Sequence, residues 1–217
     1  MSYYYNNNGE RGGGFLSNVP RVTKNLLIIN VLIYIATYVG ERMLQTNVMS
    51  WLVLYDPRST LFRIWQPITY MFMHGGFWHI FMNMYTLFIF GSVVERMIGE
   101  KKFLMMYIIS GLGAALTHIV VMIAMKGGAA PMLGASGAVY GVLITYAMIF
   151  PESRISLIFP PISMSAKWLV IIFAAISLLV GVTDKAQGVA HFAHLGGMIF
   201  GFIITYLWKK SGRLFDR

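Results

Sequence analysis

Residues 132–150 read MLGASGAVYGVLITYAMIF, an apolar run of helical length that opens with Gly134-Ala135-Ser136-Gly137. A second apolar run near the C-terminus contains Ala193-His194-Leu195-Gly196-Gly197 close to its start. Each run places one chemically reactive side chain inside a segment that is otherwise suited to lipid. Polar and ionisable groups are costly in lipid, so they usually face the interior of a helix bundle and mark a functional site. The two runs therefore predict a helical membrane protein with Ser136 and His194 in its interior.

The composition as a whole is typical of a membrane protein with several spans. Of the 217 residues, 57% are apolar and only 12% are charged, which is outside the range of ordinary soluble domains. A helical span needs roughly 20 apolar residues to cross about 30 Å of hydrocarbon. Six segments are candidates, approximately 24–40, 77–97, 103–125, 132–150, 166–183 and 189–208. The expected fold is an all-α membrane protein, a bundle of six transmembrane helices.

The formal net charge of +9 is distributed in a way that orients the chain in a membrane. The basic residues flank the spans and form no single stripe, so nucleic acid is not an expected partner. With the N-terminus inside, the cytoplasmic segments hold twelve of the 17 Lys and Arg residues and the outer segments hold five. This excess predicts that both termini are cytoplasmic. We expect a multi-pass protein of the cell (inner) membrane of a prokaryote.

The spans form one predicted domain between two polar ends. Residues 1–18 are rich in Tyr, Asn and Gly without apolar periodicity, and they are predicted to be a disordered cytoplasmic tail. Residues 19–210 are the predicted six-span membrane domain, and residues 211–217 are a short cytoplasmic tail. Arg21 and Lys24 precede the first apolar run, but no small-x-small cleavage site follows it. That run is therefore expected to be a retained span and not a signal peptide.

Four polar side chains on three spans share one depth. The second, fourth and sixth spans run from outside to inside, and His79, Asn83, Ser136 and His194 lie about two to six residues past their outer ends. At about 1.5 Å per residue, all four lie within roughly 10 Å of the outer surface. Ser136 and His194 are therefore predicted to form a Ser–His nucleophilic site. His79 and Asn83 share a helix face and can donate hydrogen bonds, which suits them to stabilise an oxyanion.

Small residues predict close packing around this site. Two small-xxx-small pairs let helices approach each other closely. These pairs are Gly137 with Gly141 on the fourth span and Gly197 with Gly201 on the sixth. Close packing would bring Ser136 within hydrogen-bond reach of His194. Tyr140, one turn below Ser136, is expected to stack on the imidazole and to fix its orientation.

The predicted site is a dyad that needs no metal and no cofactor. None of the eight acidic residues lies within a span at this depth, since Glu95 ends the second span and Asp184 lies in an outer loop. The sequence has no cysteine, which excludes a thiolate nucleophile. His74 and His79 are five residues apart, with no acid nearby to complete a metal site. His74 and His118 are expected to be structural and His191 interfacial.

These motifs resemble those of the rhomboid family of intramembrane serine proteases. The matching pieces follow in the family's order over about residues 20–210: His74-(four residues)-His79-(three)-Asn83, Gly91-Ser92-Val93-Val94-Glu95 with Gly99, Gly134-Ala135-Ser136-Gly137 with Tyr140, and Ala193-His194-Leu195-Gly196-Gly197 with Gly201. The resemblance implies a serine endopeptidase that cleaves transmembrane segments of other membrane proteins near their outer ends. It implies that Ser136 is the nucleophile and His194 the general base. It also places His79 and Asn83 at the oxyanion hole, with supporting roles for Tyr140, Gly134, Gly137 and Gly197.

One position departs from the family's pattern. The first-loop motif of the family is often Trp-Arg, and here it reads Trp65-Gln66. Glutamine lacks the guanidinium fork of arginine, so the way in which this loop is held is open. The loop, about residues 41–76, is rich in aromatic side chains and is expected to lie partly in the membrane interface.

Two functions other than proteolysis are possible for a membrane protein with these motifs. A non-catalytic rhomboid-like protein that binds client transmembrane helices would be marked by loss of Ser136 or His194, and both are present. A transporter that uses histidines as proton relays would need coupled acids at midplane depth, which the sequence lacks. The expected partners are transmembrane protein substrates and the lipid bilayer, and the oligomeric state is left open.

Overall fold

The computed structural model describes residues 17–124, 130–156, 161–183 and 188–215. Nearly all of the predicted tail 1–18 and the expected loop residue Asp184 lie outside these residues. The described chain is mostly helical, and five helices are long and apolar enough to cross a membrane. They are α1 (Arg21–Met43), the continuous segment α4 (Phe77–Thr86), η2 (Leu87–Gly91) and α5 (Ser92–Ile98), α6 (Glu100–Ala124), α8 (Ala166–Thr183) and α9 (Gly188–Lys210). The structure thus supports a helical membrane protein with five candidate spans.

The segment predicted to be the fourth span is shorter than expected. Its helix, α7 (Ser136–Ile149), has 14 residues, which is about 21 Å at ~1.5 Å per residue and less than the roughly 30 Å of a hydrocarbon core. The helix begins at Ser136 because Gly134 has a φ of +115°, a conformation that ends regular helix. The predicted run 132–150 therefore contributes an extended lead-in followed by a short helix.

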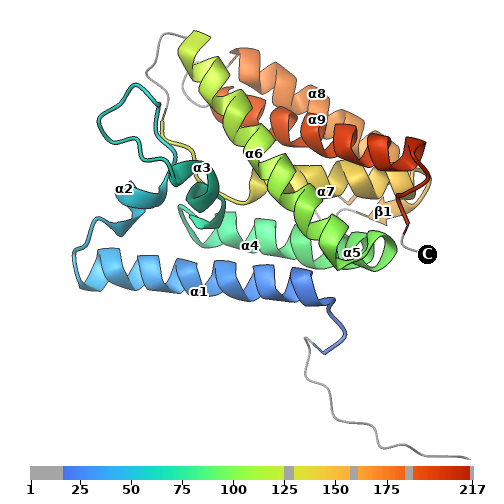
Figure 1. Cartoon of the computed structure of the whole chain (residues 1–217), viewed down its shortest axis with the longest axis horizontal. Coiled ribbons are helices and arrows are strands. Elements are labelled where there is room, and N and C mark those ends of the chain that lie inside the picture. Colours follow the sequence, from blue (N-terminus) through green and yellow to red (C-terminus); the bar gives the residue numbers. More distant parts are fainter. Residues whose placement is uncertain (1–16, 125–129, 157–160, 184–187, 216–217) are drawn as a thin grey trace, which may run out of the picture.

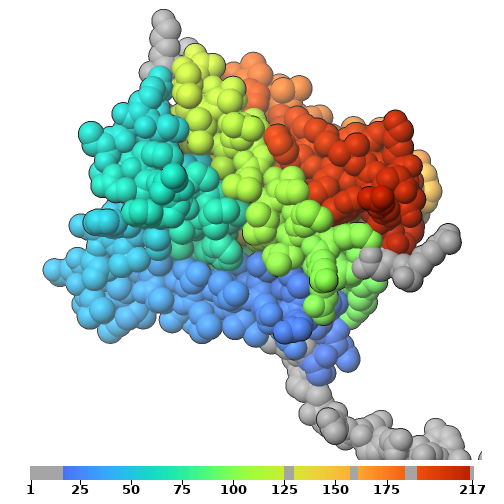
Figure 2. Space-filling model, in the orientation of Figure 1, coloured from blue at the N-terminus to red at the C-terminus, as the bar shows by residue number. Residues whose placement is uncertain are grey.

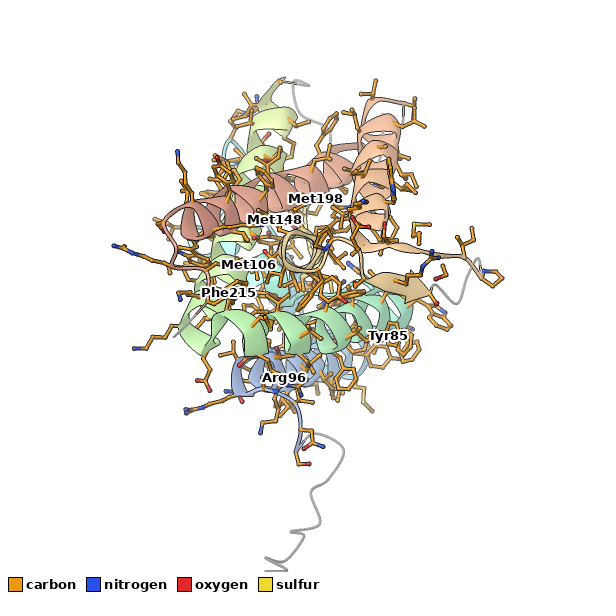
Figure 3. All side chains as sticks on the ribbon, turned by 90° about the vertical axis from the view of Figure 1, so that its right-hand side faces the viewer. Tyr85, Arg96, Met106, Met148, Met198 and Phe215 are labelled. Carbon is orange, nitrogen blue, oxygen red and sulfur yellow. The ribbon has the colours of Figure 1, made fainter. Side chains whose placement is uncertain are left out.

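The short helix α7 lies at the centre of the bundle. It packs against α6 on one side and α9 on another (Figure 1), and eight of its residues are buried. A helix that is apolar on all sides is typical of a core position. Figure 2 shows α6 as a diagonal band, with α1 and the first loop on one side and α9 on the other. Met106, Met148 and Met198 lie near the middle of the bundle (Figure 3).

The first loop contains three short helical turns and is held by a buried glutamine. The turns are α2 (Val48–Leu52), α3 (Gln66–Thr69) and η1 (Tyr70–Phe72). The side chain of Gln66 is 0% exposed, and its Oε1 accepts a hydrogen bond from the Tyr55 N–H at 3.3 Å. Its Nε2 donates to the carbonyls of Leu61 at 3.0 Å and Trp51 at 3.4 Å. Gln66 therefore fixes the loop through neutral hydrogen bonds and needs no guanidinium.

A β-hairpin that the sequence analysis did not predict follows α7. Strand β1 (Arg154–Ser156) pairs antiparallel with β2 (Ser163–Ser165). The hairpin lies at the end of α7 opposite Ser136 (Figure 1). We call this end of the molecule the hairpin end and the other the Ser136 end.

A buried carboxylate fastens α1 to the bundle at the hairpin end. Glu95, on α5, is 2% exposed. It accepts hydrogen bonds from the Val22 N–H at 2.8 Å, the Thr23 N–H at 2.7 Å and the Thr23 hydroxyl at 2.7 Å. The N–H groups in the first turn of a helix have no partner within the helix, and the positive end of the helix dipole favours a carboxylate there. Glu95 therefore caps α1 from a different helix.

We expect Glu95→Gln to lower the free energy of unfolding by about 1–3 kcal/mol, because it weakens charge-assisted hydrogen bonds to buried N–H groups. The measurement is unfolding of the purified protein in detergent micelles. Glu100→Gln is the matched control, since Glu100 is exposed in the first turn of α6 and its loss should cost less than about 1 kcal/mol. Equal effects of the two substitutions would contradict the capping role of Glu95.

Candidate active site

Helices α7 and α9 bring Ser136 and His194 into direct contact. Ser136 is the first residue of α7, and His194 lies in the second turn of α9. Nε2 of His194 is 2.9 Å from Oγ of Ser136. In the tautomer that carries its proton on Nδ1, Nε2 accepts the serine proton, which is the arrangement of a nucleophile with its general base.

Two aromatic contacts orient the imidazole of His194. The ring of Tyr140 is stacked on it, with 4.5 Å between centroids and 12° between the planes. His191, one turn earlier on α9, meets the same imidazole edge-on at 5.7 Å and 83°. Within the described residues, Nδ1 of His194 has no hydrogen-bond partner, so no carboxylate completes a triad in that part of the chain. Within the described residues, ring packing and not a hydrogen bond to a carboxylate therefore orients the imidazole of His194.

Glycines set the distance between α7 and α9. A Cβ added to Gly197 would lie 2.0 Å from the carbonyl oxygen of Gly137, and a Cβ added to Gly201 would lie 2.7 Å from Cα of Gly141. On another side of α7, a Cβ added to Gly137 would lie 2.4 Å from Cβ of Ala114 on α6. Cβ atoms do not tolerate such distances, so the helices approach this closely only where side chains are absent. The two small-xxx-small pairs of the sequence face each other here.

The lead-in to Ser136 is tied to the first loop and to α6. The backbones of Leu54 and Met132 exchange two hydrogen bonds of 2.9 Å, and the Gly134 N–H donates to the Tyr70 carbonyl at 2.9 Å. The buried hydroxyl of Tyr70 in turn donates to the Gly111 carbonyl on α6 at 2.7 Å. Tyr70 therefore connects three segments beneath the serine. The role of Tyr70 could not be predicted from the sequence, because a tyrosine in an aromatic-rich loop carries no pattern that marks such a contact.

His79 and Asn83 differ in how they relate to the serine. The imidazole of His79 lies against Gly134, where an added Cβ would be 2.6 Å from Nε2. Nδ1 of His79 lies 3.5 Å from the Gly75 N–H, a long hydrogen bond in which Nδ1 is the acceptor. This contact favours the tautomer with its proton on Nε2, so His79 offers an N–H beside the serine lead-in. Nδ2 of the buried Asn83 donates to the carbonyl of His79 at 2.9 Å, within its own helix.

His74 is a buried partner of His79. It is 1% exposed, and its ring meets that of His79 edge-on at 5.1 Å. Burial, and secondarily the neighbouring His79, lower the pKa of His74 to about 4. His74 is therefore neutral at pH 7 and packs beside His79 without placing a positive charge there. His118 is buried in α6. Among the described residues, no group of three or more His, Cys, Asp or Glu side chains is placed to hold a metal ion.

Comparison with known proteins gives a match over most of the chain. Residues 61–211 match the model of the Rhomboid domain family. Rhomboid protein 1, mitochondrial, of Saccharomyces cerevisiae is 32% identical over 144 residues, which cover 64% of this chain and 40% of that protein. Presenilin-associated rhomboid-like protein, mitochondrial, of Bos taurus is 32% identical over 148 residues, covering 64% of this chain and 38% of that protein. RHOMBOID-like protein 6, mitochondrial, of Arabidopsis thaliana is 30% identical over 145 residues, covering 66% and 43%. The chain spans about two fifths of the length of these relatives.

The names of these relatives overturn one expectation from the sequence. All three are named mitochondrial, which points to an organelle membrane and makes the expected cell membrane of a prokaryote wrong. The multi-pass character of the chain is supported by its five long apolar helices. The physical reason for the error is that hydropathy and charge asymmetry predict spans and their orientation in a bilayer, but carry no information about which bilayer it is.

The packing of α7 on α9 leads to a stability prediction. Gly197→Ala places a methyl group against a backbone oxygen that no rotamer change can move, so we expect a loss of unfolding free energy of about 1–3 kcal/mol. Gly76→Ala is the control, because nothing lies within 4 Å of an added Cβ there and its φ of 170° is open to any residue. Thermal unfolding in detergent compares the two variants. A Gly197→Ala variant as stable as Gly76→Ala would show that the interface is looser than these distances imply.

Proposed function

The chain belongs to the rhomboid family, and from that premise we propose that it is an intramembrane serine endopeptidase acting on transmembrane segments of other membrane proteins. We propose that residues 19–210 form one membrane domain with six crossings, in which the short helix α7 is the fourth, between tails 1–18 and 211–217. The observation that supports the activity most directly is the 2.9 Å contact between Ser136 Oγ and His194 Nε2. A rhomboid-like protein that only binds client helices would have no use for this pair.

In the proposed reaction, Ser136 Oγ attacks the scissile carbonyl while His194 Nε2 takes its proton. The tetrahedral intermediate collapses when the imidazolium returns that proton to the leaving amine, which leaves an acyl ester on Ser136. A water molecule gives a proton to Nε2 and attacks the ester, and the imidazolium then returns that proton to Ser136 Oγ as the ester bond breaks, which releases the new carboxyl end and restores the free hydroxyl. The carbonyl of a helical peptide bond is shielded, so the substrate must unwind locally at the Ser136 end before attack.

The start of α7 is suited to stabilise the negative oxygen formed in both steps. The first N–H groups of a helix are unpaired and lie at its positive dipole end. Ser136 is the first residue of the helix, so these N–H groups lie beside the reacting carbonyl. The Nε2–H of His79, held against Gly134, is proposed as a further donor. Asn83 is proposed as a weaker donor, since one of its two N–H groups is already bound to the His79 carbonyl.

A fluorophosphonate probe tests the nucleophile and its base. The serine oxygen displaces fluoride from phosphorus, so the wild-type protein should be labelled and Ser136→Ala should not. His194→Ala should label about 10²–10⁴-fold more slowly, because it removes the general base. Ser211→Ala is the control, as this exposed serine lies at the hairpin end and its loss should leave the rate unchanged. Labelling of Ser136→Ala at the wild-type rate would refute the proposal.

Turnover of a single-span substrate tests the two oxyanion donors separately. His79→Ala should lower kcat by roughly 10²–10³, the usual effect of losing one such donor. Asn83→Ala should lower kcat by about tenfold, because its amide is partly engaged within α4. KM should change little in both variants, since the donors act on charge that develops in the transition state. A larger loss in Asn83→Ala than in His79→Ala would reverse this assignment.

A further inference from the structure

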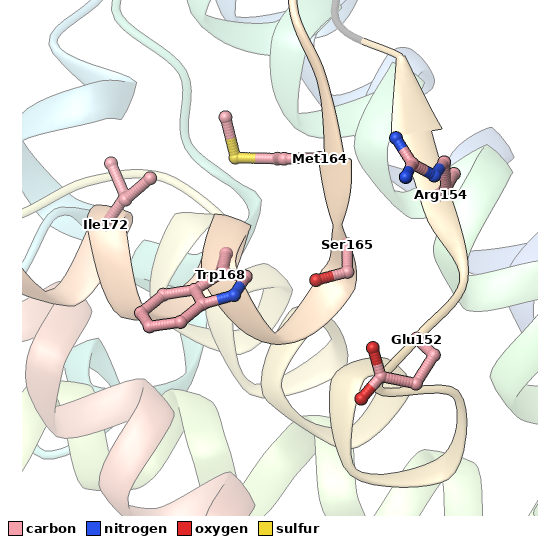
Figure 4. Close-up of a pocket in the computed structure, with 6 residues that line it drawn as sticks. All are labelled: Glu152, Arg154, Met164, Ser165, Trp168 and Ile172. Atoms are coloured by element: carbon pink, nitrogen blue, oxygen red, sulfur yellow. The ribbon is translucent and has the colours of Figure 1, made fainter.

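A pocket of about 420 Å³ lies at the hairpin end (Figure 4), and neither Ser136 nor His194 is among the residues that line it. It is an open pocket, lined by residues that follow α7, by the two strands of the hairpin and by the first two turns of α8. The lining side chains are Glu152, Arg154, Met164, Ser165, Trp168 and Ile172. Its volume is in the range of small-molecule sites, and nothing in the proposed reaction uses it. We call it the hairpin pocket.

The hairpin pocket presents unused hydrogen-bond donors and one carboxylate. Arg154 and Ser165 are paired across the two strands, so their side chains share one face of the hairpin. Within the described part of the chain, neither side chain has a hydrogen-bond partner, nor does the indole N–H of Trp168. The carboxylate of Glu152 is ion-paired with Lys167 through Oε1, which leaves Oε2 available. A positive and a negative group therefore flank the same cavity.

The position of the pocket places it where lipid headgroups meet hydrocarbon. Helix α8 begins at Ala166, and Trp168 in its first turn is 55% exposed, as is typical of an interfacial tryptophan. From Trp168, one exposed apolar stripe follows α8 toward the Ser136 end at helical spacing. Its members, Trp168, Ile172, Ile176 and Leu179, are between 39% and 65% exposed. Two of them also line the pocket, so a single molecule can occupy the pocket and lie along the stripe.

We propose that the hairpin pocket binds one glycerophospholipid with a phosphoethanolamine headgroup. The phosphate accepts hydrogen bonds from the Arg154 guanidinium and from Ser165 and Trp168, the ammonium donates to Glu152, and an acyl chain lies along α8. A phosphodiester is the anion to which a guanidinium binds with two parallel hydrogen bonds. A primary ammonium donates hydrogen bonds to a carboxylate, whereas a quaternary choline has no N–H to donate.

Native mass spectrometry of the full chain in detergent tests this proposal, with phosphatidylethanolamine and phosphatidylcholine of identical acyl chains as probes. The wild-type protein should retain phosphatidylethanolamine about five- to tenfold more tightly than phosphatidylcholine. Arg154→Gln should weaken phosphatidylethanolamine binding about tenfold. Glu152→Gln should abolish the preference between the lipids without weakening phosphatidylcholine binding. Arg21→Gln is the matched control, because Arg21 is an exposed arginine at the hairpin end that does not line the pocket, and it should bind like the wild type.

Three results would overturn the proposal. They are equal retention of the two lipids, an Arg154→Gln variant that binds like the wild type, and an Arg21→Gln variant that loses as much as Arg154→Gln. Soluble glycerophosphoethanolamine has the headgroup without the acyl chains. If it competes for the hairpin pocket as strongly as phosphatidylethanolamine does, the α8 stripe has no role in binding. Ser136→Ala should bind lipid like the wild type, so failure of this proposal and failure of the proposed protease activity are separate outcomes.

Discussion

Two glycine backbones meet where α7 and α9 pack together. Where α9 crosses α7, Gly197 leaves room for the carbonyl oxygen of Gly137 at a distance that no Cβ could occupy. Lipid tails are as apolar as leucine, so helices in a bilayer gain little from apolar burial, and close packing of small residues takes its place. The same pair of helices carries Ser136 and Tyr140 on α7 and His194 on α9, so this approach contributes to the 2.9 Å contact and to the stacking of Tyr140 on the imidazole. A methyl group there would disturb the proposed site without touching a reacting atom.

Polar side chains outside this crossing hold the segments together at the two ends of the bundle. At the hairpin end, Glu95 satisfies the first N–H groups of α1. At the Ser136 end, Gln66 satisfies three backbone groups of the first loop, and Tyr70 joins that loop to α6 and to the serine lead-in. Unpaired backbone groups are costly when buried, so non-helical chain near a membrane needs such partners. The short helix α7 can therefore begin only at Ser136, because its non-helical lead-in is bonded to the first loop.

Helices whose apolar residues repeat over many turns could be predicted from the sequence. Features that depend on a single residue or a single contact could not. Hydropathy indicated the five long helices within a few residues, because about twenty apolar residues leave a strong signal. Hydropathy overestimated the length of the helix predicted at 132–150. It does not register the positive φ of Gly134, and α7 begins only at Ser136. The hairpin β1–β2 was missed because three-residue strands are too short for a period to be read. The spacing of glycines and polar residues indicated which side chains would meet around Ser136, whereas the anchoring by Gln66 depends on backbone groups that have no sequence signature.

Within the described residues no acid lies beside Nδ1 of His194, so other contacts keep this imidazole, the proposed base, in position. In a triad, a carboxylate both orients the imidazole and stabilises its positive form. Here the stacked ring of Tyr140 and the edge of His191 orient it, and such ring contacts contribute only about 0.5–1.5 kcal/mol each. The glycine contact between α7 and α9 sets the backbone position of His194, and the two rings then orient its imidazole. In the dyad that we propose, helix spacing and ring packing together take the place of a third catalytic side chain.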